Sequence, residues 1–190
     1  DMLRFSAQRN PAKAAIIFGA RRLSYGALDQ DANRFANAVL ARGLAKGDAI
    51  AIIARNVPEY AVYHFGCART GCLSVNLMPA YAPDEIAAIL ARTEARLVVV
   101  EAAFEDKLAA VKDKLPRLDL VVVIGAPGGA PGIDGAGDFD GFLAPHGAAP
   151  PAVKLSPSDP YAMTFTGGTT GVPKGALVSH YARFVSSYTT

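Results

Sequence analysis

The residues of this chain best suited to chemistry lie together near its C-terminal end. Residues 165–175 read Phe-Thr-Gly-Gly-Thr-Thr-Gly-Val-Pro-Lys-Gly. The glycines allow positive φ angles and let the backbone approach a ligand closely, and successive backbone N–H groups in such a turn form an anion site. Three hydroxyls and one ammonium group add further donors. This combination suits a polyphosphate, which would be held by Thr166, Gly167, Gly168, Thr169, Thr170, Gly171 and Lys174.

Two short apolar runs must position this loop. Residues 161–165 precede it and residues 176–178 follow it, and both runs are typical of strands. Pro173, whose φ angle is fixed, restricts the backbone just before Lys174. The loop is therefore predicted to connect two strands at the edge of a sheet.

Two other phosphate-binding motifs do not fit the loop. The P-loop of kinases and GTPases needs Gly before its lysine and Ser or Thr after it, whereas Lys174 lies between Pro173 and Gly175. The dinucleotide fingerprint needs the spacing G-x-G-x-x-G and a following helix, and here a strand follows. The alternative without chemistry is a Gly/Thr surface loop that binds nothing. Without a ligand, we expect residues 167–172 to be among the most mobile of the chain.

Composition excludes several classes of protein. The chain has 190 residues and a net charge of +2, which is too balanced for a nucleic-acid-binding protein. No apolar run approaches the roughly 18 residues of an integral membrane segment, and no signal-peptide pattern opens the chain. Cys67 and Cys72 are too few for a zinc site or a disulfide framework. We expect them to be reduced core thiols of a cytoplasmic protein.

Strand and helix patterns alternate along residues 14–124. Residues 14–18 and 22–24 predict a hairpin, and Ser24 is placed to cap a helix that ends at Gly43. Asn56 and Glu59 have the spacing of a capping box for the next helix. The other strands are expected at 49–54, 72–77, 97–100 and 120–124, and the other helices at 58–69, from Pro83 onward, and at 103–115. The predicted fold is α/β, a mostly parallel sheet flanked by helices on both faces, with ligands at the carboxyl ends of its strands.

The alternation stops at a segment rich in glycine and proline. Gly or Pro makes up 13 of the 28 residues from Gly125 to Ala152, which is typical of a loop or linker. Phe139, Phe142 and Leu143 could fix one helical turn of it to the domain, and the segment is either a variable connection or a functional lid. The chain divides into an N-terminal α/β subdomain at 1–124, a connection at 125–157, and the start of a second subdomain at 158–190.

The three histidines do not complete a catalytic or metal-binding set. His64 and His146 have no Cys, Asp or Glu at ligand spacing, so we interpret both as structural. His180 follows Ser179, which is placed to cap a helix. No Ser/His/Asp or Cys/His combination can be assembled, so a hydrolase has no support.

The glycine- and threonine-rich loop resembles the phosphate loop of the adenylate-forming superfamily, Thr-(Ser/Gly)-Gly-(Ser/Thr)-Thr-Gly-x-Pro-Lys-Gly. This superfamily includes acyl-CoA synthetases, adenylation domains of nonribosomal peptide synthetases, and luciferases. Three upstream segments resemble family motifs in the same order: 23–28 resembles L-T-Y-x-x-L, 47–52 resembles G-D-x-V-A-I, and 71–81 resembles G-A-x-x-V-N-x-N-P-x-Y-T. The resemblance covers the whole chain and implies the N-terminal part of an acyl-CoA synthetase-like large domain.

The resemblance also implies an activity. Such enzymes attack the α-phosphorus of ATP with a carboxylate, which gives an acyl-adenylate and pyrophosphate, and a thiol, usually that of CoA, then takes the acyl group. Thr166 to Gly171 would hold the ATP phosphates and Lys174 would support them electrostatically. By the same resemblance Thr166 is a candidate Mg²⁺ ligand. Many relatives have a histidine at the position of His180, near the acyl and phosphate groups, so His180 is either a candidate site residue or the first-turn residue of a capped helix.

Departures from the family pattern refine this expectation. Gly167 replaces the serine of many relatives, and the loop together with V-N-x-M-P-x-Y at 75–81 favours fatty acyl-CoA ligases. The resemblance places the acyl pocket, the adenine and ribose contacts, the acidic Mg²⁺ ligand and the catalytic lysine after Thr190. We therefore expect a fragment of a longer carboxylate–CoA ligase, inactive by itself.

The expected partners are a carboxylic acid, ATP and CoA, without nucleic acid. An exposed sheet edge could also pair two copies of the chain as a homodimer. One alternative is an adenylation domain of a peptide synthetase, which loads a carrier protein instead of CoA. The other is a non-catalytic nucleotide- or partner-binding module.

Overall fold

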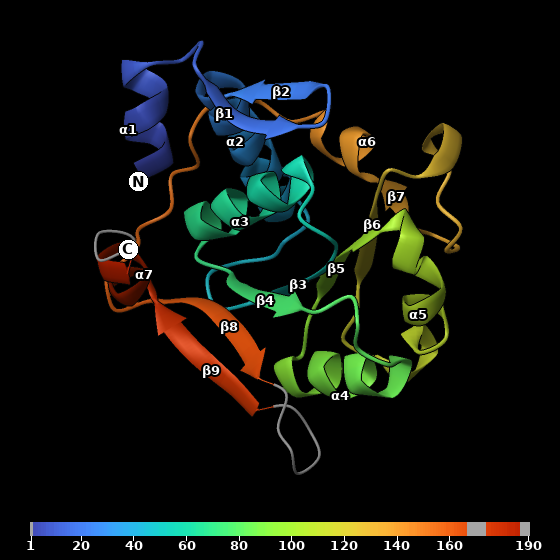
Figure 1. Ribbon diagram of the computed structural model, residues 1–190. Coiled ribbons are helices and arrows are strands. Elements are labelled where there is room, and N and C mark those ends of the chain that lie inside the picture. The colour runs from blue at the N-terminus through green and yellow to red at the C-terminus, as the bar shows by residue number, and fades with distance from the viewer. Residues whose placement is uncertain (1, 167–173, 187–190) are drawn as a thin grey trace.

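A seven-stranded sheet forms the centre of the part of the chain that the structure describes, residues 2–166 and 174–186 of the computed structural model (Figure 1). The strand order is β7-β6-β5-β3-β4-β8-β9, and every neighbouring pair is parallel except β8 and β9. The strands are β3 (Ala49–Ile53), β4 (Leu73–Leu77), β5 (Leu97–Glu101), β6 (Leu120–Ile124), β7 (Gly137–Asp138), β8 (Pro160–Thr166) and β9 (Lys174–Ser179). This confirms the predicted mostly parallel sheet.

Burial on both faces explains the apolar sequences of the central strands. In β3, Ile50 and Ile52 contribute to one core, and Ala51 and Ile53 contribute to a second core. All four side chains are fully buried. Because successive side chains of a strand point to opposite faces, an uninterrupted apolar run is needed where both faces are covered.

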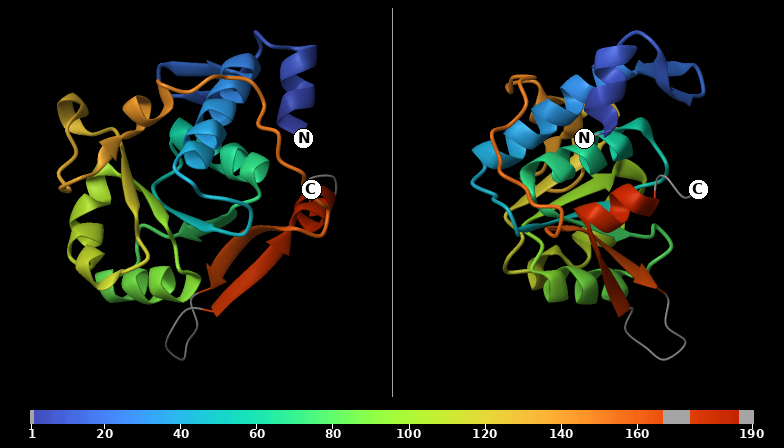
Figure 2. Two further views of the ribbon diagram at one scale, coloured as in Figure 1. Left: turned by 180° about the vertical axis from the view of Figure 1, so that it is seen from behind. Right: turned by 90° about the vertical axis from the view of Figure 1, so that its left-hand side faces the viewer.

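Helices cover the two faces of the sheet, as Figures 1 and 2 show. In the first core, the rings of Phe35 and Tyr63 lie edge to face with centroids 5.8 Å apart. In the second core, Ile86 and Ile89 are buried against the sheet. The first core is built with α1 (Met2–Arg9), α2 (Tyr25–Ala41), α3 (Pro58–Thr70) and α6 (Phe139–Leu143), and the second with α4 (Pro83–Thr93) and α5 (Glu105–Ala109). None of the helices in the described ranges has the length and apolar character needed to span a membrane.

Local signals placed several element ends correctly. The predicted hairpin is formed by β1 (Ala14–Phe18) and β2 (Arg21–Ser24). The Ser24 hydroxyl accepts a hydrogen bond from the N–H of Ala27 at 3.2 Å and caps α2. Gly71 ends α3 with a φ of 71°, a left-handed conformation that favours glycine.

The capping box predicted from Asn56 and Glu59 is wrong. α3 begins at Pro58, and Val57 is its N-cap, without a side-chain hydrogen bond. Proline suits the first helical position because its missing N–H would have had no partner there. Asn56 therefore lies one residue too early to cap the helix. Glu59 instead accepts a hydrogen bond from Arg21 at 2.6 Å.

The single helix expected at 103–115 is divided into three pieces. A 3₁₀ helix at Ala102–Phe104 leads into α5, and a second 3₁₀ helix follows at Lys112–Lys114. Leu108 and Val111 are both buried. The φ angle of −128° at Val111 interrupts the helical backbone between α5 and the second 3₁₀ helix.

The connection contains more regular structure than its composition predicted. It includes β7, which pairs with β6, and α6, which confirms the expected helical turn at Phe139. Asn33 and Asn37 donate hydrogen bonds of 2.7 to 2.9 Å to the carbonyls of residues 147–149 and hold the following stretch against α2. Since β7 and β8 both join the central sheet, one sheet extends through all three predicted segments. The division into subdomains stays a prediction.

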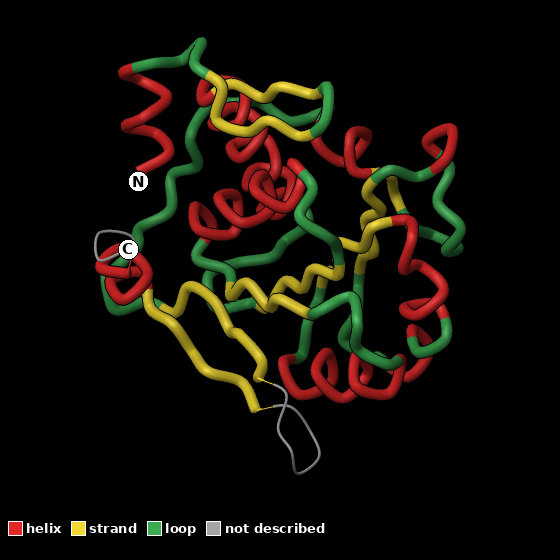
Figure 3. The backbone as a smooth tube through the Cα atoms, viewed as in Figure 1, coloured by secondary structure: helices red, strands yellow, loops and turns green. Residues whose placement is uncertain are grey.

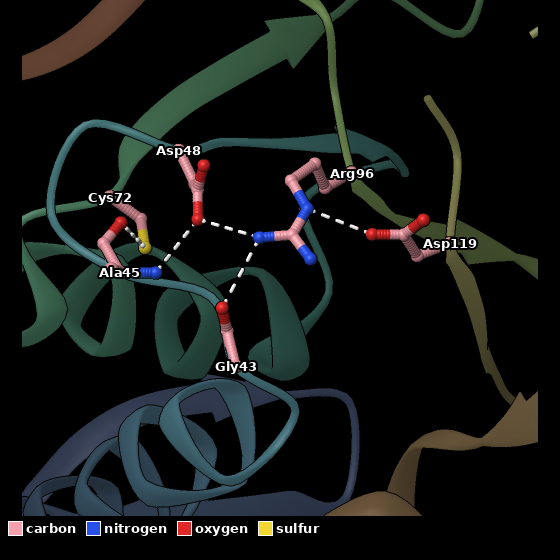
Figure 4. Close-up of polar contacts among 6 residues, drawn as sticks. All are labelled: Gly43, Ala45, Asp48, Cys72, Arg96 and Asp119. Carbon is pink, nitrogen blue, oxygen red and sulfur yellow. Dashed lines mark hydrogen bonds and ion pairs between the residues drawn. The ribbon is translucent and has the colours of Figure 1, made fainter. Parts of the chain in front are cut away.

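One polar network joins the amino ends of the parallel strands (Figure 4). Arg96 donates to the carboxylate of Asp48 at 2.9 Å and to that of Asp119 at 2.8 Å. Arg96 also donates to the carbonyl of Gly43 at 3.2 Å, and Asp48 accepts from the N–H of Ala45 at 2.8 Å. The network fixes the starts of β3, β5 and β6 relative to one another. Asp48 of the G-D-x-V-A-I segment thus has a structural role at the edge opposite the strands' carboxyl ends.

Candidate phosphate-binding site

The two ends of the predicted phosphate loop lie opposite each other in the β8–β9 hairpin. Thr166 and Lys174 are the last register partners of this antiparallel pair. Figure 3 traces the two strands as they extend to the ends of the loop. The other predicted phosphate-binding residues lie outside the described residues, as does the stretch for which mobility was predicted: Gly167, Gly168, Thr169, Thr170 and Gly171.

These loop ends lie at the carboxyl edge of the parallel strands. β8 pairs in parallel with β4, from Ser74 opposite Ala162 to Asn76 opposite Thr164. Thr166 therefore leaves the sheet at the edge where β4 also ends. In open α/β sheets, ligands bind outside this edge. The expected position of the loop relative to the sheet agrees with the position of its two ends.

Phe165 anchors the hairpin one residue before the loop. Its side chain is 5% exposed and belongs to the second core. Its partner on β9 is Gly175, where an added Cβ would lie 3.0 Å from Phe165 Cε1 and 2.9 Å from Met163 Sδ. Both distances are too short for an ordinary contact, so a side chain at 175 would displace the Phe165 ring and the Met163 side chain. The motif pattern alone assigned no role to this last glycine.

The described ends of the loop contribute one cation and one threonine. Lys174 is exposed and begins β9, and Thr166 ends β8. No group of three or more His, Cys, Asp or Glu residues in the described ranges is placed to hold a metal ion. The assignment of Thr166 as a Mg²⁺ ligand stays a prediction.

A second polar feature of the same edge is the contact between Arg55 and Glu101. The strand order changes direction across β3, and Arg55 follows β3 while Glu101 ends β5. Arg55 donates to the Glu101 carboxylate from its backbone N–H and from Nε, each at 2.9 Å. These hydrogen bonds hold the pKa of Glu101 below its usual value. The pair borders a cleft of about 520 Å³ and fixes the backbone after β3.

The structure does not bring His180 to the loop ends. Pro160 and Ser179 are partners at the opposite end of the hairpin, and a strand of 7 residues at about 3.3 Å each puts the two ends roughly 20 Å apart. Ser179 accepts a hydrogen bond from the N–H of Ala182 at 3.1 Å and caps α7 (His180–Ser186). The geometry favours the capped-helix interpretation of His180, and its assignment as a site residue stays a prediction.

His180 belongs instead to a row of three rings. Tyr161 lies between His64 and His180, with ring centroids 5.0 Å and 5.1 Å away. The Tyr161 hydroxyl is hydrogen-bonded to His64 Nε2. Burial lowers the pKa of His64 to about 4, and the positive charge of Arg183 acts in the same direction. His64 is therefore neutral near pH 7, consistent with the structural role predicted for it. The row lines a mainly apolar cavity of about 1150 Å³ between α1, α3, α7 and residues 150–157.

Comparisons with known proteins identify the family of the chain. The model of the AMP-binding enzyme family matches residues 3–190. The fatty acid–[acyl-carrier-protein] ligase ScoC of Streptomyces coeruleorubidus is 31% identical over 183 residues, which cover 95% of this chain and 32% of that protein. The medium-chain acyl-CoA ligase Mig of Mycobacterium avium is 32% identical over 193 residues, covering 94% of this chain and 34% of that protein.

The fold is also that of a solved structure. The anthranilate CoA ligase AuaEII, solved in complex with anthranoyl-AMP, superposes with a TM-score of 0.89 at 24% identity, covering 95% of this chain and 34% of that chain. The present chain thus spans about a third of the length of these relatives. Because the family model extends over nearly all of its residues, the chain belongs to the AMP-binding enzyme family.

Proposed function

We propose that this chain is the N-terminal part of an ATP-dependent carboxylate–CoA ligase that acts on a fatty acid. The observation that carries the proposal is the pairing of Thr166 with Lys174 at the carboxyl edge of the parallel strands. This pairing holds together the two ends of a loop rich in glycine and threonine, beside a cation. The names of the relatives ScoC and Mig, which are ligases of fatty or medium-chain acids, support a fatty acid over an amino acid.

The proposed reaction has two steps. A carboxylate oxygen attacks the α-phosphorus of ATP, the bond from that phosphorus to the bridging oxygen of the β-phosphate breaks, and pyrophosphate leaves. The sulfur of a thiol then attacks the acyl carbon, and AMP leaves. Thr166 to Gly171 donate hydrogen bonds to the phosphate oxygens, and Lys174 offsets the negative charge that develops on the leaving pyrophosphate. Mg²⁺ would neutralise further phosphate charge, with Thr166 as a ligand.

The acceptor thiol separates this proposal from a second candidate. ScoC is named for an acyl-carrier-protein acceptor and Mig for CoA. A carrier-protein acceptor, as in a peptide-synthetase adenylation domain, would use the same first step and the same loop.

A non-catalytic nucleotide- or partner-binding module is the third candidate. A cytoplasmic location and the pairing of two copies through an exposed sheet edge are further parts of the proposal.

The test is carboxylate-dependent exchange between ATP and pyrophosphate in the full-length protein, with a panel of fatty, aryl and amino acids. Exchange with fatty acids only, followed by thioester formation with CoA, is the expected result. Thioester formation only with a carrier protein would favour the second candidate. The chain by itself should be inactive and bind ATP weakly, because contacts from the loop alone would supply only part of the binding free energy for ATP. Micromolar ATP affinity by calorimetry would contradict that expectation.

A further inference from the structure

On its β4 side, β8 loses its backbone pairing before the predicted phosphate loop begins, although its pairing with β9 continues to Thr166. The pairing of β8 with β4 ends where Asn76 lies opposite Thr164. Beyond that point, on the β4 side, the carbonyl of Phe165 accepts a hydrogen bond from the hydroxyl of Tyr81 at 3.4 Å. Tyr81 lies in the turn between β4 and α4. The Tyr81 hydroxyl therefore extends the hydrogen bonding on the β4 side of β8 by one residue, from Thr164 to Phe165.

Tyr81 is itself held from several directions. Its N–H donates to the carbonyl of Met78 at 3.0 Å, and its own carbonyl accepts from Lys107 Nζ at 3.1 Å. Lys107 also donates to the carbonyl of Pro79 at 2.7 Å, so one ammonium group fixes both ends of this turn. The ring of Tyr81 is 5% exposed and packs in the second core. The hydroxyl thus acts from a fixed position.

Lys107 links this turn to the rest of the carboxyl edge. Its ammonium lies 5.9 Å from the ring centroid of Phe104, and the guanidinium of Arg55 lies 5.8 Å from the same ring. Arg55 is in turn held by Glu101 at the end of β5. Contacts thus run continuously from the ends of β3 and β5, through the turn after β4, to the last described residues of β8.

We propose that Tyr81 is a positioning residue for the phosphate loop and that Lys107 holds Tyr81 in place. This inference rests on the proposed function, because it assigns Tyr81 to the same loop. Tyr81 fixes the carbonyl of Phe165 and therefore the direction in which the chain passes through Thr166 into the loop. Donors that stabilise phosphate charge must be in place before the reaction, since displacements of about 1 Å weaken their effect severely. Tyr81 acts through the backbone and does not touch the reacting atoms.

The kinetic test compares Tyr81→Phe with the wild-type full-length protein in ATP–pyrophosphate exchange. The loss of one hydrogen bond should raise the KM for ATP about three- to tenfold, while the KM for the acid stays the same. Lys107→Met should act in the same direction, and the double variant should be no worse than the more affected single variant. Tyr63→Phe is the matched control, because its buried hydroxyl donates to the carbonyl of Ile50 at 2.6 Å and accepts from Ser74 at 3.1 Å in the first core, on the face of the sheet opposite Tyr81. It should leave the KM for ATP unchanged.

Amide hydrogen exchange of residues 161–166 provides a readout that needs no activity. In the ligand-free protein, these amides should exchange faster in Tyr81→Phe than in the wild type, and Tyr63→Phe should not change them. Unchanged exchange in Tyr81→Phe would overturn the inference, and so would faster exchange with an unchanged KM for ATP. If the wild-type protein activates no acid, the proposed function fails, and with it the assignment of Tyr81 to a phosphate loop, while faster amide exchange would still establish its contact with β8.

Discussion

Phe165 and Gly175 are direct partners across the β8–β9 hairpin, and the Phe165 ring occupies the space that a side chain at 175 would need. Phe165 is buried in the core while Gly175 is on the exposed edge strand. The hairpin is thus anchored one residue inside the ends of the phosphate loop. An anchor at this point limits how far Thr166 and Lys174 can move relative to the sheet.

Gly175→Ala should therefore destabilise the protein and weaken ATP-dependent exchange together. We expect the free energy of unfolding to fall by about 1–3 kcal/mol, because the new Cβ displaces Phe165 and Met163. Chemical denaturation of the full-length protein measures the change. Gly147→Ala is the control, since no heavy atom lies within 4 Å of an added Cβ there, and it should change stability by less than about 0.5 kcal/mol. Equal effects of the two substitutions would contradict the anchor.

Acid should destabilise the fold through His64. Its pKa is about 4 in the folded protein against 6.5 for the free side chain, so the unfolded state binds the proton more readily. The contribution of neutral His64 to the free energy of unfolding is fully present above about pH 6.5. It is lost as the pH falls toward 4, which lowers the free energy of unfolding by up to about 3 kcal/mol. His64→Gln should flatten this part of a stability curve measured from pH 8 to pH 4.

Glu101→Gln is the control for that pH window. The pKa of Glu101 is lowered by Arg55, so its contribution is present above its usual value near 4.5 and is lost as the pH falls through the lower folded value. The variant should be less stable at pH 7 and should keep the slope of the wild type between pH 6.5 and 5. The same slope in His64→Gln and in the wild type would show that His64 is not the titrating group.

The network around Arg96 should matter for stability and not for catalysis. Arg96→Met removes hydrogen bonds to Asp48 and Asp119 at the amino edge of the sheet, and we expect a loss of about 1–2 kcal/mol. The KM for ATP should stay the same, because the two ends of the predicted phosphate loop, Thr166 and Lys174, lie at the opposite edge. Arg92→Met, at an exposed position of α4, is the matched control. A changed KM for ATP in Arg96→Met would mean that the two edges are coupled.

Short-range patterns were sufficient to predict much of the fold. The apolar runs of β3 and β6 predicted strands buried on both faces, because only such strands lack polar residues on either side. Ser24 and Gly71 marked helix ends through capping rules that involve a few neighbouring residues. Where two local rules competed, as at Asn56 and Pro58, the fixed φ and missing N–H of proline determined where the helix begins.

The remaining features depend on contacts that local patterns do not contain. The bond from Tyr81 to Phe165 joins residues 84 positions apart, and that from Arg96 to Asp48 spans 48 positions. Tyr81, Phe165 and Asp48 lie in segments that resemble family motifs, but the resemblance gives no physical reason for these residues. Only the strand order and register show which of these residues meet. They also show that His180 lies at the end of the hairpin away from the loop.

The most direct test of the account is carboxylate-dependent ATP–pyrophosphate exchange with the wild-type full-length protein and its Lys174→Ala variant. Lys174 lies at one end of the phosphate loop, so the variant should lose at least about tenfold in ATP-dependent turnover. Lys154→Ala, at an exposed position in the connection, should match the wild type. Exchange with one class of acid, weakened by Lys174→Ala alone, is the result the account predicts. No exchange with any acid, or exchange unaffected by Lys174→Ala, would contradict it.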